Sequence, residues 1–143
     1  MEGGRLARER YTFASMYTIS VERTICAAHA LEISGSRETL HGHNWRVQVA
    51  LGGGSLDGDG LLVDFHAMEA ALAQVLEPFS NKNFNDIPPF DRINPSAELI
   101  AQFVAISMGQ LTPRGVRVLS ATVSEAPGCT ATYANPFGGG GST

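Results

Sequence analysis

The order of the periodic segments constrains the fold of this chain more than any other feature. Residues 17–22 and 43–51 alternate apolar and polar side chains, and so predict strands. Residues 115–125 and 130–134 predict two more strands near the other end, and two helical patterns lie between the pairs. Strands grouped at both ends with helices between them predict an α+β fold, with an antiparallel sheet and helices on one face.

Each helical pattern has a candidate start. Asp64 is expected to cap the first helix, whose end is marked by Pro78 and whose apolar positions are Phe65, Met68, Leu72, Val75, Leu76 and Phe79. Asn94 is the expected N-cap of the second helix, with Pro95 at its first position. Its predicted apolar face consists of Leu99, Ile100, Phe103, Val104, Ile106 and Leu111.

Length, composition and charge exclude several classes of protein. The 143 residues fit one domain, and we expect a mobile leader over 1–15, a single domain over 16–137 and a flexible glycine-rich tail over 138–143. No apolar run reaches the roughly eighteen residues of a membrane span. A net charge of -4 argues against nucleic acid as a partner. The lack of a signal-like segment, with two isolated cysteines, predicts a cytoplasmic protein.

The histidines are the main candidates for chemistry. His41 and His43 are two residues apart in an extended segment, so both side chains point to one face, and pairing with the preceding strand would bring His29 alongside. Three imidazoles with one open position form a typical catalytic zinc site. The plainer alternative is that these histidines are packed core residues. His66 is expected to be solvated or to cap a helix, and Cys26 should lie on the strand face opposite His29.

Six short segments, taken in order, carry a family resemblance. They are Cys-Ala-Ala-His at 26–29, Leu-His-Gly-His-Asn-Trp at 40–45, Leu-Val-Asp-Phe at 62–65, Asn-Asp-Ile-Pro at 85–88, Asn-Pro-Ser-Ala-Glu at 94–98 and Ser-Glu at 124–125. The chain thereby resembles the 6-pyruvoyltetrahydropterin synthase and 6-carboxytetrahydropterin synthase family from about residue 16 to 135. The resemblance implies the tunnelling fold, or T-fold, in which a four-stranded antiparallel sheet is backed by two helices. It also implies trimers or hexamers with pterin sites between subunits.

The same resemblance assigns roles to individual residues. It implies that Zn²⁺ is held by His29, His41 and His43, that Glu125 anchors the pterin, and that Ser96 lies in the segment lining the pocket. A carboxylate suits a pterin because the 2-amino group and N3–H present two donors side by side. Without the resemblance, Glu125 would be interpreted as an exposed carboxylate at a strand end.

Two departures from the family bear on the reaction. Arg37 stands where the synthases have a cysteine base, and Ser80 and Asn81 stand where they have an Asp-His pair. Neither serine nor asparagine titrates in the useful range. The run from Arg37 to His43 instead resembles a subgroup in which a glutamate, here Glu38, acts as the base. That subgroup is implied to convert dihydroneopterin triphosphate to 6-hydroxymethyl-dihydropterin for folate synthesis. The alternative for Glu38 is a surface carboxylate paired with Arg37.

The leading functional hypothesis is therefore a zinc-dependent lyase that cleaves a dihydropterin side chain by a retro-aldol reaction. A 6-carboxytetrahydropterin synthase and a catalytically impaired homologue that only binds a pterin-like ligand are the alternatives. A metal-dependent hydrolase is a third class, but the sequence contains no additional group of residues that marks hydrolysis.

Overall fold

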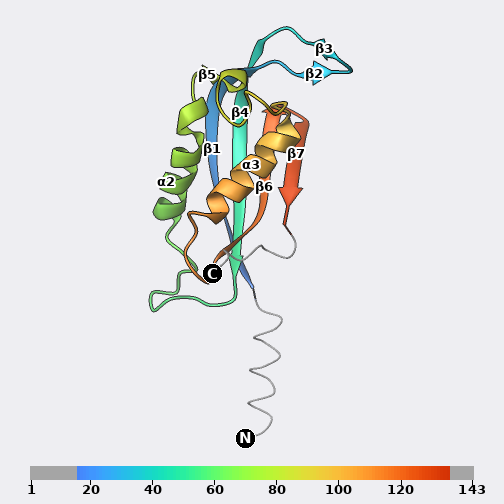
Figure 1. Cartoon of the computed structure of the whole chain (residues 1–143). Helices are drawn as coiled ribbons and strands as arrows, with labels where there is room; N and C mark the ends of the chain where they lie inside the picture. Colours follow the sequence, from blue (N-terminus) through green and yellow to red (C-terminus); the bar gives the residue numbers. More distant parts are fainter. Residues whose placement is uncertain (1–15, 136–143) are drawn as a thin grey trace, which may run out of the picture.

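A computed structural model describes residues 16–135 (Figure 1). The expected leader at 1–15 and tail at 138–143 lie outside this range. The main elements are β1 (Tyr17–His29), β4 (His41–Gly53), α2 (Phe65–Leu76), α3 (Ala97–Gly109), β6 (Arg117–Ala126) and β7 (Cys129–Ala134). The predicted order of strands and helices is confirmed, and the architecture is the T-fold.

The long strands form one sheet of order β5-β1-β4-β6-β7. The four long strands pair antiparallel, whereas β5 (Lys82–Asn83) adds two residues parallel to β1. β1 and β4 pair over thirteen residues each, from Tyr17↔Gly53 to His29↔His41. β1 is longer than predicted because Arg23 interrupts the apolar alternation without interrupting the ladder. The full pairing brings the ends of the two strands, and their histidines, together.

A small hairpin extends from the histidine end of the sheet (Figure 1). It consists of β2 (Glu32–Ile33) and β3 (Ser36–Arg37), which pair antiparallel. The turn has Ser34 at φ 53° and Gly35 at φ 79°, a left-handed conformation that glycine adopts readily. Two single-turn 3₁₀ helices, Glu77–Phe79 and Phe84–Asp86, complete the connection between α2 and α3.

The helix starts were predicted with mixed success. Asp64 caps α2 as expected and accepts a hydrogen bond from the His66 N–H at 2.9 Å. The expected N-cap of the second helix, Asn94, is wrong, because α3 starts after Ser96, whose hydroxyl accepts from the Leu99 N–H at 3.2 Å. The Asn94 amide instead binds the backbone N–H and carbonyl of Glu32, at 2.9 and 3.1 Å.

The core fills the space between the helices and one face of the sheet. Trp45, Val47, Val49 and Leu51 of β4 are at most 1% exposed and belong to one core cluster with residues of both helices. α2 buries Met68, Leu72, Val75 and Leu76 as predicted, whereas Phe65 is exposed. The predicted face of the second helix is wrong at Ile106, which is 54% exposed, and at Leu111, which lies beyond α3 and is exposed. The buried face of α3 instead includes Ala101, Ala105 and Met108.

The other face of the sheet is polar. Side-chain hydrogen bonds join Thr122 to Thr132 at 2.9 Å and Ser124 to Thr130 at 3.0 Å across β6 and β7. Cys26 also lies on this face, opposite His29 as predicted, and its thiol donates to Asn44 Oδ1 at 2.9 Å. Within residues 16–135, neither helix combines the length and the hydrophobicity that a bilayer crossing requires.

Candidate metal centre

The register of β1 and β4 builds the histidine cluster. His29 pairs directly with His41, and His43 pairs with Ala27, two residues back along β1. Side chains two apart share a face, so all three imidazoles lie on the helix-covered face. Their ring centroids are 4.7 to 5.3 Å apart. The structure thus brings together the three histidines that the sequence singled out, while His66 is exposed on α2.

Backbone carbonyls fix the orientation of two of the rings. His29 Nδ1 lies 2.8 Å from the carbonyl oxygen of Pro95, and His41 Nδ1 lies 2.8 Å from that of Thr39. Because a carbonyl only accepts hydrogen bonds, each Nδ1 donates to its carbonyl, and each Nε2 is the ring nitrogen that faces the cluster. Histidine ligands of metals are commonly oriented by such second partners.

Two further residues, Trp45 and Asn85, support the cluster. Trp45 packs edge-on against His29 and His43, with ring centroids 4.8 and 5.4 Å away, and donates its Nε1–H to the Ala27 carbonyl at 3.0 Å. Asn85 binds both the N–H and the carbonyl of Ala30, at 2.8 and 2.9 Å. These positioning roles were missed from the sequence, although both residues belong to segments quoted for the resemblance.

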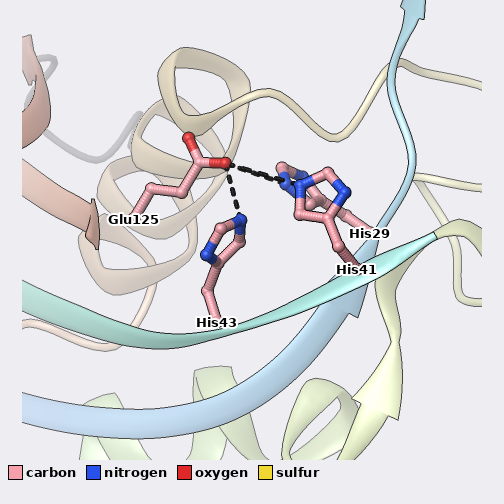
Figure 2. A group of neighbouring side chains, drawn as sticks. All are labelled: His29, His41, His43 and Glu125. Carbon is pink, nitrogen blue, oxygen red and sulfur yellow. Dashed lines mark hydrogen bonds and ion pairs between the residues drawn. The ribbon is translucent and has the colours of Figure 1, made fainter. Parts of the chain in front are cut away.

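Glu125 closes the cluster from the end of β6, and Figure 2 shows its carboxylate pointing at the imidazoles. Its Oε1 lies 3.0 Å from His29 Nε2, 2.9 Å from His43 Nε2 and 3.9 Å from His41 Nε2. One ligand atom from each of the four residues lies within 4.8 Å of every other. Glu125 is therefore not an isolated exposed carboxylate.

His43 shows why a cation fits here. Its Nε2 is buried and, within the part of the chain described, has no hydrogen-bond partner, since the 2.9 Å approach of Glu125 lacks the alignment of a hydrogen bond. Burial lowers the pKa of His43, and the nearby histidines lower it further against the opposing charge of Glu125. A neutral imidazole with an unpartnered buried nitrogen is a suitable metal ligand. The donor set therefore fits a zinc ion held by nitrogen ligands.

The remaining predicted site residues lie at the rim or nearby. Glu38 Oε1 is 3.8 Å from His41 Nε2 and accepts a hydrogen bond from the Leu31 N–H at 2.9 Å. Ser96 caps α3 directly after Pro95, so its backbone adjoins the carbonyl that orients His29. Arg37 instead lines a neighbouring cavity of about 390 Å³ together with Arg92 and Asn94. Asn81 lies beside β1, where its N–H donates to the Cys26 carbonyl at 2.6 Å.

The fold and the site together define a T-fold protein with a candidate metal centre of three histidines at one end of the sheet. Comparison with known proteins identifies the family within this fold class. The family model described as 6-pyruvoyl tetrahydropterin synthase matches residues 18–136. The chain belongs to the 6-pyruvoyl tetrahydropterin synthase family, as the motif resemblance predicted.

Solved structures agree with the fold. The 6-pyruvoyl tetrahydropterin synthase of Caenorhabditis elegans superposes with a TM-score of 0.74 at 20% identity, over 85% of this chain and 96% of that one. A Plasmodium vivax 6-pyruvoyltetrahydropterin synthase, in a variant whose catalytic glutamate is replaced by alanine, gives 0.70 at 23% identity, over 85% and 98%. The Plasmodium falciparum enzyme gives 0.69 at 22% identity, over 85% and 98%. Family and fold support a pterin synthase-type function and a lyase-type enzyme.

Proposed function

We propose that the protein is a zinc-dependent lyase that cleaves the side chain of 7,8-dihydroneopterin triphosphate or a related dihydropterin. The observation that carries this proposal is the convergence of three imidazole nitrogens, two of them oriented by backbone carbonyls, at the open end of a T-fold sheet. His29, His41 and His43 would hold the zinc. When bound, zinc supplies a Lewis acid that polarises the oxygen atoms of a substrate.

The pterin head would be recognised by Glu125, with Ser96 in the adjoining segment. The two oxygens of the Glu125 carboxylate match the paired donors of the pterin 2-amino group and N3–H. The Ser96 hydroxyl accepts from the Leu99 N–H as a helix cap, which leaves its own proton free to donate to a ligand. Recognition of the head would thus be separate from cleavage of the side chain.

Glu38 would act as the general base. Its carboxylate lies 3.8 Å from His41 Nε2, and its 32% exposed side chain is open to a ligand at the rim of the cluster. It would take the proton of the second side-chain hydroxyl, whose oxygen becomes an aldehyde as the bond between the first two side-chain carbons breaks. The electrons of that bond move to the first side-chain carbon and through it into the N5=C6 imine.

The balance of this reaction needs no further co-reactant. Return of a proton to the first side-chain carbon restores the imine and yields 6-hydroxymethyl-dihydropterin, and the other fragment leaves as glycolaldehyde triphosphate. The Plasmodium vivax relative has a catalytic glutamate, which is a precedent for a carboxylate in a catalytic role. It supports Glu38 here, because Arg37 stands in place of the usual cysteine.

A pterin-binding homologue without catalysis is the second candidate. One observation favours it: an oxygen of Glu38 is already engaged by the Leu31 N–H, so the carboxylate also has a structural use. A 6-carboxytetrahydropterin synthase is the remaining alternative within the family. We propose trimers or hexamers with sites between subunits, in the cytoplasm, with folate biosynthesis as the pathway served.

Product identification separates these candidates. The zinc-loaded protein is incubated with 7,8-dihydroneopterin triphosphate, and the pterin products are identified by mass spectrometry, with His43→Ala as the control. Release of 6-hydroxymethyl-dihydropterin by the wild type alone is the expected result. A 6-carboxy or 6-pyruvoyl product would contradict the side-chain cleavage, and tight binding without any product would establish the binding homologue.

A further inference from the structure

The position of Glu125 Oε1 carries an inference about the resting state of the metal centre. A tetrahedral site with metal–ligand distances of 2.0–2.1 Å places neighbouring ligand atoms about 3.3 Å apart. Oε1 lies 2.9, 3.0 and 3.9 Å from the Nε2 atoms of the three histidines, on both sides of that value. This one oxygen, which is also within hydrogen-bond distance of His29 Nε2, therefore lies close to the position of the fourth ligand of a metal held by the histidines.

The end of β6 explains how Glu125 reaches that position. Two pairings flank it, Ser124 with Thr130 and Ala126 with Cys129, and the register shifts between them. Such a bulge leaves Glu125 outside the ladder. Strand alternation from the buried Val123 turns Glu125 toward the helix-covered face, where the histidines lie. Its side chain is 27% exposed and so has room to move outward.

Within residues 16–135, Glu38 is the only other carboxylate in contact with His29, His41 or His43. Its Oε1 approaches His41 Nε2 alone, at 3.8 Å, and is held by the Leu31 N–H. Glu125 Oε1 instead faces all three histidines. The geometry therefore selects Glu125, and not Glu38, as the residue that can complete the coordination.

We propose that Glu125 closes the metal centre as its fourth ligand in the substrate-free protein, and that the substrate must displace it. This inference rests on the proposed function, because a catalytic zinc needs an open position for its substrate. The displaced carboxylate is then free to accept the hydrogen bonds of the pterin head. One side chain thereby couples recognition of the pterin to opening of the metal centre, so that other small ligands meet a closed site.

The test uses the full chain loaded with Co²⁺ in place of zinc, because the visible absorption of Co²⁺ reports its ligands. Wild type is compared with Glu125→Gln, which removes the charge, and with Glu125→Asp, which keeps the charge but shortens the side chain by one methylene. Imidazole is the probe, since it is a neutral ligand that the charge at position 125 does not repel. Circular dichroism confirms that each variant is folded.

Both variants should change the Co²⁺ spectrum and bind imidazole more tightly than wild type. A site that is open for a tenth of the time binds a probe about tenfold more weakly than one that is always open, so a change of at least about tenfold is expected. Equal imidazole affinity and equal spectra in all three proteins would overturn this inference alone. Failure of the wild type to bind Co²⁺ would overturn it together with the zinc chemistry of the proposed function.

Discussion

Replacing Glu38 by glutamine tests its proposed role as a base without disturbing its structural contact. Glu38 Oε1 accepts the Leu31 N–H at 2.9 Å, and the Glu38 N–H donates to the Leu31 carbonyl at 2.9 Å. A glutamine retains an amide oxygen for the first of these bonds but cannot take a proton. Alanine loses both the hydrogen bond and the base. General-base catalysis contributes about 10²–10⁴-fold, so both variants should lose that much rate.

The two variants should differ in stability and not in metal content. A partly buried hydrogen bond contributes about 0.5–1.5 kcal/mol, so Glu38→Ala should lower the free energy of unfolding by about that amount, while Glu38→Gln should leave it nearly unchanged. Single-turnover rates, urea unfolding and zinc content are measured on the same preparations. Wild-type turnover in Glu38→Gln would refute the assignment of the base. Slow turnover in Glu38→Ala alone would show that the reaction needs the hydrogen bond between Glu38 and the Leu31 N–H, and not proton transfer to Glu38.

Three further predictions concern assembly, recognition and pH. Sedimentation at micromolar concentration should give a trimer or hexamer, because association removes the open edges of the sheet, and a 15.2 kDa species alone would contradict this. Glu125→Gln should weaken dihydroneopterin binding to metal-free protein by about 1–3 kcal/mol in calorimetry, since the glutamine amide presents a donor to the pterin donors. Unchanged affinity would exclude Glu125 as the residue that anchors the pterin. Burial lowers the pKa of His43 below its ordinary 6.5. Between this lowered pKa and 6.5, the unfolded chain carries a proton on His43 that the folded chain lacks. The free energy of unfolding of metal-free protein should therefore fall as the pH drops through that window, and His43→Gln should show a weaker fall in urea unfolding.

The sequence predicted the sheet and the helices well because their signals are local. Alternation in β4 and the apolar spacing in α2 follow directly from which face each element buries. The start of α3 was placed too early because Asn94 and Ser96 are both good cap residues. What decides between them is a contact with Glu32, sixty-two residues away in the chain, and no local pattern reports such a contact.

The sequence predicted which residues form the site but not how they are arranged. The spacing of His41 and His43 gives a shared face, whereas the alignment of His29 with His41 depends on the full register of β1 and β4. Glu125 reaches the cluster from an unpaired position at the end of β6, and the register with β7 that leaves it unpaired cannot be seen in the local sequence. The carbonyls that orient the rings are backbone groups, and backbone groups carry no sequence signature.

Metal analysis of purified histidine variants tests the central claim, a zinc centre formed by three histidines, most directly. Zinc per chain is measured for wild type, His41→Ala and His43→Ala, with His66→Ala as the matched control, because the side chain of His66 is 91% exposed on α2. The account predicts one tightly bound zinc in wild type and His66→Ala, and loss of that zinc in the other two. Stoichiometric zinc retained by both His41→Ala and His43→Ala would contradict it.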